Sequence, residues 1–124
     1  MATSTITPNA VMGKDGDWYY LRCGGYCILT LTYQITGANI NTSTNGQYQS
    51  DTIDTQLNVP SFVKSLLTVS GACGNGSQGG GIRLHRIVLN GVSGASNTLR
   101  FILSANQSIN SASMPVTVIV FGTC

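Results

Sequence analysis

Four cysteines are the residues of this 124-residue chain that are best suited to metal or redox chemistry. Zinc sites are usually built from paired CxxC knuckles, and redox catalysis normally uses CxxC beside a helix. The spacings here are 4, 46 and 51 positions, so one CxxxC pair is followed by two isolated cysteines. We therefore predict no metal site and no cofactor, and leave open either two disulfides or buried free thiols that act as small hydrophobes. The four cysteines are Cys23, Cys27, Cys73 and Cys124.

The single histidine, His85, is the only candidate base for hydrolysis. A serine triad needs a nucleophile, a base and a group that orients the base, and the sequence has no GxSxG elbow to supply the nucleophile. We therefore expect His85 to face solvent or an interface, and we predict that the protein is not an enzyme. The carboxylates form two close pairs in turn-forming or polar segments, where turn formation explains them better than calcium binding or glycoside hydrolysis. They are Asp15, Asp17, Asp51 and Asp54.

An aromatic hairpin is the clearest local structure in the sequence. Residues 17–23 (DWYYLRC) are rich in β-formers, a Gly24-Gly25 pair follows, and residues 26–36 alternate between an apolar and a more polar face. This pattern predicts two strands joined by a tight turn, with one face on a core. A two-residue loop puts Cys23 and Cys27 on opposite faces, which disfavours a bond between them, whereas a three-residue loop would reverse this.

Further strands are expected where short β-prone runs are separated by turns rich in glycine and asparagine. Their spacing of about 10–20 residues is typical of a β-sandwich or jelly roll. We predict one antiparallel all-β domain over residues 17–124 and an extended N-terminal arm over residues 1–16, used for attachment or for contact between subunits. The later strands are expected at residues 66–72, 82–90, 98–105 and 114–124, with polar loops at 37–52, 74–81 and 106–113 and at most a short edge strand at 47–49.

The composition excludes several classes of function. Only 8% of the residues are charged and the net charge is +2, so the chain lacks the clustered Lys and Arg of a nucleic-acid groove. No run of about 18 apolar residues could insert into a membrane, and the N-terminus lacks the pattern of a classical leader. A polar exterior with so little charge suits a protein packed in a particle or held outside the cell, because free cytosolic proteins carry roughly 25% charged residues.

Aromatic side chains are the candidate ligand-binding groups. They gather on the predicted hairpin, where cross-strand pairs stabilise a sheet and where exposed rings could stack on sugars. A structural role is expected for most of them, because one face of the hairpin must be core. The residues chosen as candidates for ligand binding, on the hairpin and the loops, are Trp18, Tyr20, Tyr48 and His85.

Three short segments resemble the receptor-binding or tail-fibre C-terminal head domains of tailed bacteriophages. Residues 17–33 (DWYYLRCGGYCILTLTY) resemble the opening aromatic hairpin of that family, residues 59–62 (VPSF) its middle Pro-aromatic step, and residues 116–124 (VTVIVFGTC) its closing strand. The family has Arg-Lys where this chain has Leu21-Arg22, and a closing Arg-Trp where it has Thr123-Cys124. The tryptophan that follows the turn in the family is missing.

This resemblance implies a non-enzymatic virion protein, assembled in the host cytoplasm. Family members are typically trimeric β-sandwich heads, so we expect a homotrimer that contacts other virion proteins. Its role would be host adhesion, through a surface saccharide or protein, or decoration that stabilises the particle. The alternative is a secreted, lectin-like carbohydrate-binding module. Neither reading involves nucleic acid or insertion into a membrane.

Overall fold

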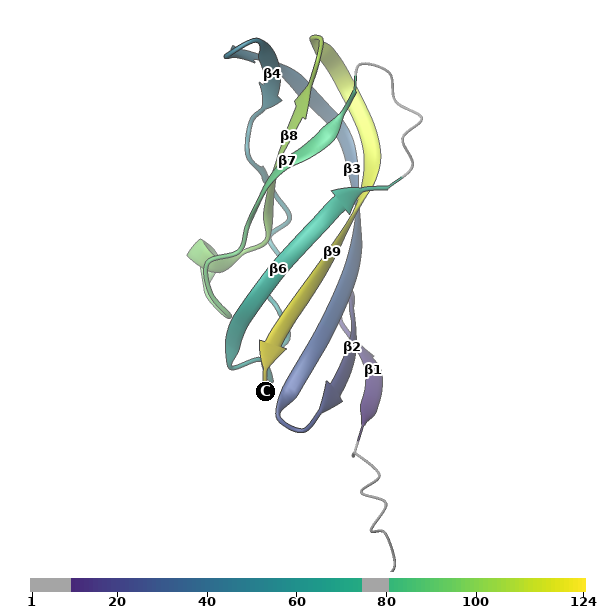
Figure 1. The fold of residues 1–124 in the computed structure, drawn as a ribbon, viewed down its shortest axis with the longest axis vertical. Coiled ribbons are helices and arrows are strands. Elements are labelled where there is room, and N and C mark those ends of the chain that lie inside the picture. The colour runs from purple at the N-terminus through teal and green to yellow at the C-terminus, as the bar shows by residue number, and fades with distance from the viewer. Residues whose placement is uncertain (1–9, 75–80) are drawn as a thin grey trace, which may run out of the picture.

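The computed structural model describes residues 10–74 and 81–124, and in this part of the chain the fold is antiparallel β-structure with a single 3₁₀ turn at Ala95–Asn97 (Figure 1). The prediction of an all-β domain is confirmed. No helix in the described ranges is long and apolar enough to cross a membrane. The strands are β1 (Val11–Asp15), β2 (Trp18–Cys23), β3 (Tyr26–Thr44), β4 (Gln47–Ser50), β5 (Ile53–Asp54), β6 (Ser65–Cys73), β7 (Arg83–Val88), β8 (Arg100–Ala105) and β9 (Ile109–Thr123).

The aromatic hairpin forms as predicted, with β2 and β3 joined by a two-residue loop. Cys23 pairs with Tyr26 and Arg22 with Cys27, so the two cysteines point to opposite faces of the sheet. Both loop glycines have positive φ, at 59° and 82°, which only glycine adopts without strain. The turn therefore fixes the register of the hairpin.

Two long strands, β3 and β9, pair along most of their length and form the spine of the molecule (Figure 1). The expected loops at residues 37–52 and 106–113 are wrong in part, because β3 continues to Thr44 and β9 begins at Ile109. The pairing survives there through register shifts beside Gly37, whose φ is 69°. The bulges interrupt the alternation of apolar and polar residues in the sequence, although Ile40 and Ala112 are still buried.

The sheet curls around one apolar core. On the edge of β3 that does not pair with β9, β2 is the neighbour at the start of the strand and β4 is the neighbour from Ile40 onward. β4 pairs in turn with β8, and β8 pairs with β7. On the other side β9 pairs with β6, and β6 comes back close to β7. The enclosed core is built from alternate residues of the long strands and β8, among them Leu29, Val118 and Phe101, which are at most 1% exposed.

The edge strands differ from the predicted pattern. Residues 11–15 were expected to be part of an arm but pair with β2 as β1, while residues 1–9 of the arm and residues 75–80 of the loop lie outside the described ranges. In β7 a bulge after Leu84 leaves His85 without a register partner. Leu84 and Ile87 therefore both pack against the core, although strict alternation predicts that they lie on opposite faces.

Candidate functional site

Trp18, a predicted ligand-binding residue, is part of the core. Its side chain is 3% exposed, and its indole N–H donates a hydrogen bond to the backbone carbonyl of Asn58 at 2.9 Å. The structure thus gives Trp18 a packing role, with little of its ring open to a ligand and its nitrogen already hydrogen-bonded. Alternation along the hairpin places Trp18 on the inner side of the sheet.

The other three predicted ligand-binding residues do not form one site. Tyr20 is half-buried and packs edge-on against Phe62, with ring centroids 4.9 Å apart. Tyr48, on β4, is half-buried against the core. His85 is exposed on β7, as expected, and its Nε2 lies 3.2 Å from Nε2 of Gln49. Since β2 lies at one end of the molecule and β4 at the other, these side chains cannot converge on one ligand (Figure 1).

A contiguous apolar surface was not predicted, and it lies on the side of the sheet that faces away from the core. The register aligns one row straight across four strands, from β1 through β2 and β3 to β9: Met12, Leu21, Ile28 and Phe121. Neighbouring rows add further large side chains, and Tyr26 stacks on Phe121 at 5.7 Å between ring centroids. We call this surface the outer face, defined by Met12, Tyr19, Leu21, Tyr26, Ile28, Ile119 and Phe121.

The outer face is exposed along its whole width. Met12 is 79% exposed, and the other six side chains of the face are between 36% and 56% exposed. Two shallow hollows lie on either side of Ile28: one of about 190 Å³ toward Met12 and Tyr19, and one of about 70 Å³ toward Tyr26 and Phe121. The face therefore has both protruding side chains and depressions of side-chain size.

The chemistry of the outer face changes along the strands. Next to the apolar rows come hydroxyl side chains, and Thr32 and Thr117 share a hydrogen bond of 3.0 Å across β3 and β9. The one charged side chain within these rows is Lys14, whose ammonium lies 5.1 Å from the ring centroid of Tyr19. Such a face favours a neutral, largely apolar partner.

The four cysteines all lie within the described residues and carry free thiols. Cys27 is buried on the inner side, at 1% exposure. Burial raises the pKa of Cys27, the Cys124 thiol raises it further, and the charge of Arg22 acts in the opposite direction. Burial also raises the pKa of Cys73 on β6.

No group of three or more His, Cys, Asp and Glu side chains gathers as a metal site would require within residues 10–74 and 81–124. The carboxylates serve local structure instead. Asp54 accepts a hydrogen bond from the backbone N–H of Gln56 at 2.8 Å and forms an ion pair with Arg100 at 3.4 Å. The backbone hydrogen bond from Gln56 is the main reason that the pKa of Asp54 lies below its ordinary value.

Comparison with protein-family models, with curated proteins and with solved structures gave no match to this chain.

The signal for the outer face was present in the sequence. Tyr26 and Ile28 alternate with Cys27 and Leu29, so this part of β3 is apolar on both sides. A strand that is apolar on both sides is typical of a sheet that is covered on both sides. Recognising the face also required β1, which supplies Met12 and which was expected to be part of the arm.

Proposed function

We propose that this protein is a non-catalytic structural module of a virion, and that its copies associate through the outer face. The observation that carries the proposal is the row of apolar side chains that runs across four strands on the side of the sheet away from the core. A folded chain gains nothing from exposing such a row, whereas an assembly gains the free energy of removing it from water.

The area of the face is sufficient for a stable contact. A large side chain offers about 200 Å² of surface. Applied to the exposed fractions of the seven side chains, this value gives roughly 700 Å² of apolar surface. A standard protein interface buries about 800 Å² on each partner, so these residues alone supply most of one side.

A second copy of this chain is the partner that fits best. The face is apolar and exposed across four strands, so the same face of other copies is a surface of matching chemistry. It carries almost no charge, which disfavours nucleic acid and an acidic membrane surface. In a cyclic trimer each outer face would lie next to the faces of two neighbouring copies around the three-fold axis.

The resemblance to bacteriophage head domains supports a trimer within a virion, in which three outer faces surround the symmetry axis. The end of the molecule that carries β4, β7 and β8 would then point away from the contact and serve adhesion or decoration. A lectin-like role is less well supported, because burial of Trp18 removes the largest ring of the predicted sugar-stacking platform.

Native mass spectrometry at micromolar concentration tests the association. We expect a trimer for the unaltered chain and a monomer for Ile28→Asp, because an unpaired carboxylate buried in the contact would weaken association by more than about 100-fold. Val11→Asp is the matched control, since Val11 is 52% exposed but alternates to the inner side of β1. A monomeric unaltered chain, or oligomers that both substitutions leave intact, would overturn the role of the face.

Localisation tests the virion assignment separately. Antibody labelling of purified particles in the electron microscope should place the protein at regular positions on them. If the protein is absent from particles and remains free in the medium, the lectin-like alternative replaces this proposal even when the trimer is present.

A further inference from the structure

We propose that Cys27 and Cys124 form a disulfide when the protein meets a small disulfide such as oxidised glutathione. The bond would join the start of β3 to the end of β9. It rests on the geometry of one end of the sheet and is independent of the role of the outer face.

The register brings these two cysteines together. Cys27 lies opposite Gly122 on β9. Cys124 follows Gly122 by two positions, so it lies on the same, inner side of the sheet. The backbone N–H of Cys124 bonds the carbonyl of Gly25 at 2.9 Å, which continues the pairing past the end of β9.

The Cys124 thiol lies against the backbone that leads into Cys27. The Cys124 thiol donates a hydrogen bond to the carbonyl oxygen of Tyr26 at 3.4 Å, and that carbonyl belongs to the peptide bond leading into Cys27. Cys124 also raises the pKa of Cys27, so the two side chains are near enough to interact. The bond would require the two Cβ atoms to come within the separation of about 4 Å that a disulfide allows.

The other two cysteines are placed where neither can compete. Cys23 lies on the outer side of β2, because the two-residue loop reverses its direction relative to Cys27. Cys73 pairs with Val116, far along β9 from Gly122 and Cys124. Of the four thiols in the described residues, only Cys27 and Cys124 share a side and an end of the sheet.

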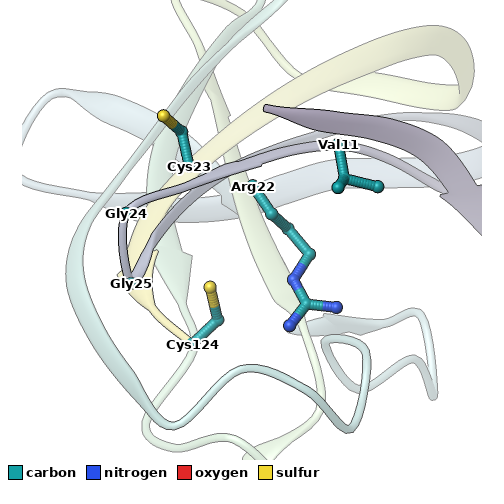
Figure 2. A pocket seen from close by; sticks show the side chains of 6 residues that line it. All are labelled: Val11, Arg22, Cys23, Gly24, Gly25 and Cys124. Carbon is teal, nitrogen blue, oxygen red and sulfur yellow. The ribbon is translucent and has the colours of Figure 1, made fainter. Parts of the chain in front are cut away.

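A small oxidant can reach this pair. A pocket of about 300 Å³ opens under the hairpin loop, and Cys124 is one of its lining residues. Figure 2 shows the Cys124 thiol and the Arg22 side chain directed toward the same space, and Cys23 is another of the lining residues. In thiol–disulfide exchange the thiolate is the attacking species.

The reaction balances with one small disulfide as the oxidant. The Cys124 thiolate attacks one of its sulfurs, forms a mixed disulfide and releases the first small thiolate. Cys27 then loses its proton and attacks Sγ of Cys124, which forms the Cys27–Cys124 bond and releases the second small thiolate. The two protein thiols lose two electrons and two protons in total, and the small disulfide is reduced to two small thiols.

Intact mass after oxidation tests the pairing. In a Cys23→Ser, Cys73→Ser variant, which keeps only the pair, oxidised glutathione should lower the mass by about 2 Da, the mass of the two hydrogens lost, and leave no adduct. Adding Cys27→Ala provides the matched control, because the mixed disulfide on Cys124 then cannot resolve. That variant should gain about 305 Da, the mass of one glutathionyl group.

Two results with the Cys23→Ser, Cys73→Ser variant would overturn the proposal. One is a glutathione adduct that persists. The other is that both of its thiols still react with iodoacetamide at a time when the Cys27→Ala control is already glutathionylated. Circular dichroism of the reduced variants shows whether they keep the fold. If they do not, the unaltered chain is oxidised, alkylated and mapped by peptide mass. Alkylated Cys23 and Cys73 together with a linked Cys27 and Cys124 support the proposal, and any other pairing refutes it.

Discussion

Two buried serines on adjoining strands are expected to respond to the same substitution with opposite signs. Ser50 ends β4, and its hydroxyl accepts a hydrogen bond from the backbone N–H of Leu103 on β8 at 2.9 Å. Ser50 lies between the part of the chain that pairs with β8 as β4 and the part that pairs with it as β5. Its side chain therefore supplies a hydrogen bond to β8 where the backbone pairing is interrupted. Ser104 is the next residue of β8 and is 0% exposed, but its hydroxyl has no hydrogen-bond partner within residues 10–74 and 81–124.

The magnitudes follow from what each hydroxyl does. Ser50→Ala leaves the buried N–H of Leu103 without a partner, which costs about 2 kcal/mol. Ser104→Ala removes a buried polar atom that gains nothing, so it should stabilise the fold by up to about 1 kcal/mol. For a domain of this size 1 kcal/mol shifts Tm by about 4 °C, so the two variants should melt roughly 10 °C apart.

Urea unfolding measures both effects with one probe, because the chain has a single tryptophan and Trp18 is buried. The midpoint should fall for Ser50→Ala and rise or stay for Ser104→Ala, with the same dependence on urea concentration in both. Equal losses of stability in the two variants would refute the reasoning. They would mean that the two hydroxyls contribute alike and that the hydrogen bond to Leu103 has no special weight.

Three further predictions concern single positions. Gly122→Ala should cost about 2 kcal/mol or more of unfolding free energy in a urea titration, because the added Cβ would lie 2.5 Å from the carbonyl oxygen of Ser65 and force β6 away from β9. The N–H of Gln56 holds the pKa of Asp54 below its ordinary value, so the carboxylate stabilises the fold above its unfolded pKa. This stabilisation is lost as the pH falls through the folded pKa. The urea midpoint of Asp54→Asn should therefore change less with pH in the acidic range than that of the unaltered chain. Burial and a raised pKa should make Cys27 the last cysteine that iodoacetamide modifies in the reduced native protein, as followed by peptide mass.

The hairpin and the class of fold could be predicted because local chemistry determines them. The Gly24-Gly25 pair selects a two-residue turn, and alternation in residues 26–36 requires one buried face. The far halves of β3 and β9 could not be found in this way. Their residues are mostly polar, and the bulges near Gly37 break the period of two, so only the partner strand holds them in the sheet.

The candidate site was harder to predict than the fold. Trp18 and Tyr20 were chosen by residue type, but alternation places both on the inner side, where packing uses them. The outer face depends on register across four strands that are distant in sequence, and register is a tertiary property. The pairing of Cys27 with Cys124 likewise depends on β9 lying beside β3, which the spacing of the cysteines does not reveal.

The position of β9 also has a consequence for biosynthesis. It lies between β3 and β6 in space, although it is the last of these strands to leave the ribosome. Until residues 109–123 have emerged, both of its neighbours have an unpaired edge, and the inner residues of the nascent chain have nothing to close over them. The domain must therefore fold after its translation rather than along with it, and in that interval a chaperone or rapid collapse has to keep these edges from pairing with those of another nascent chain.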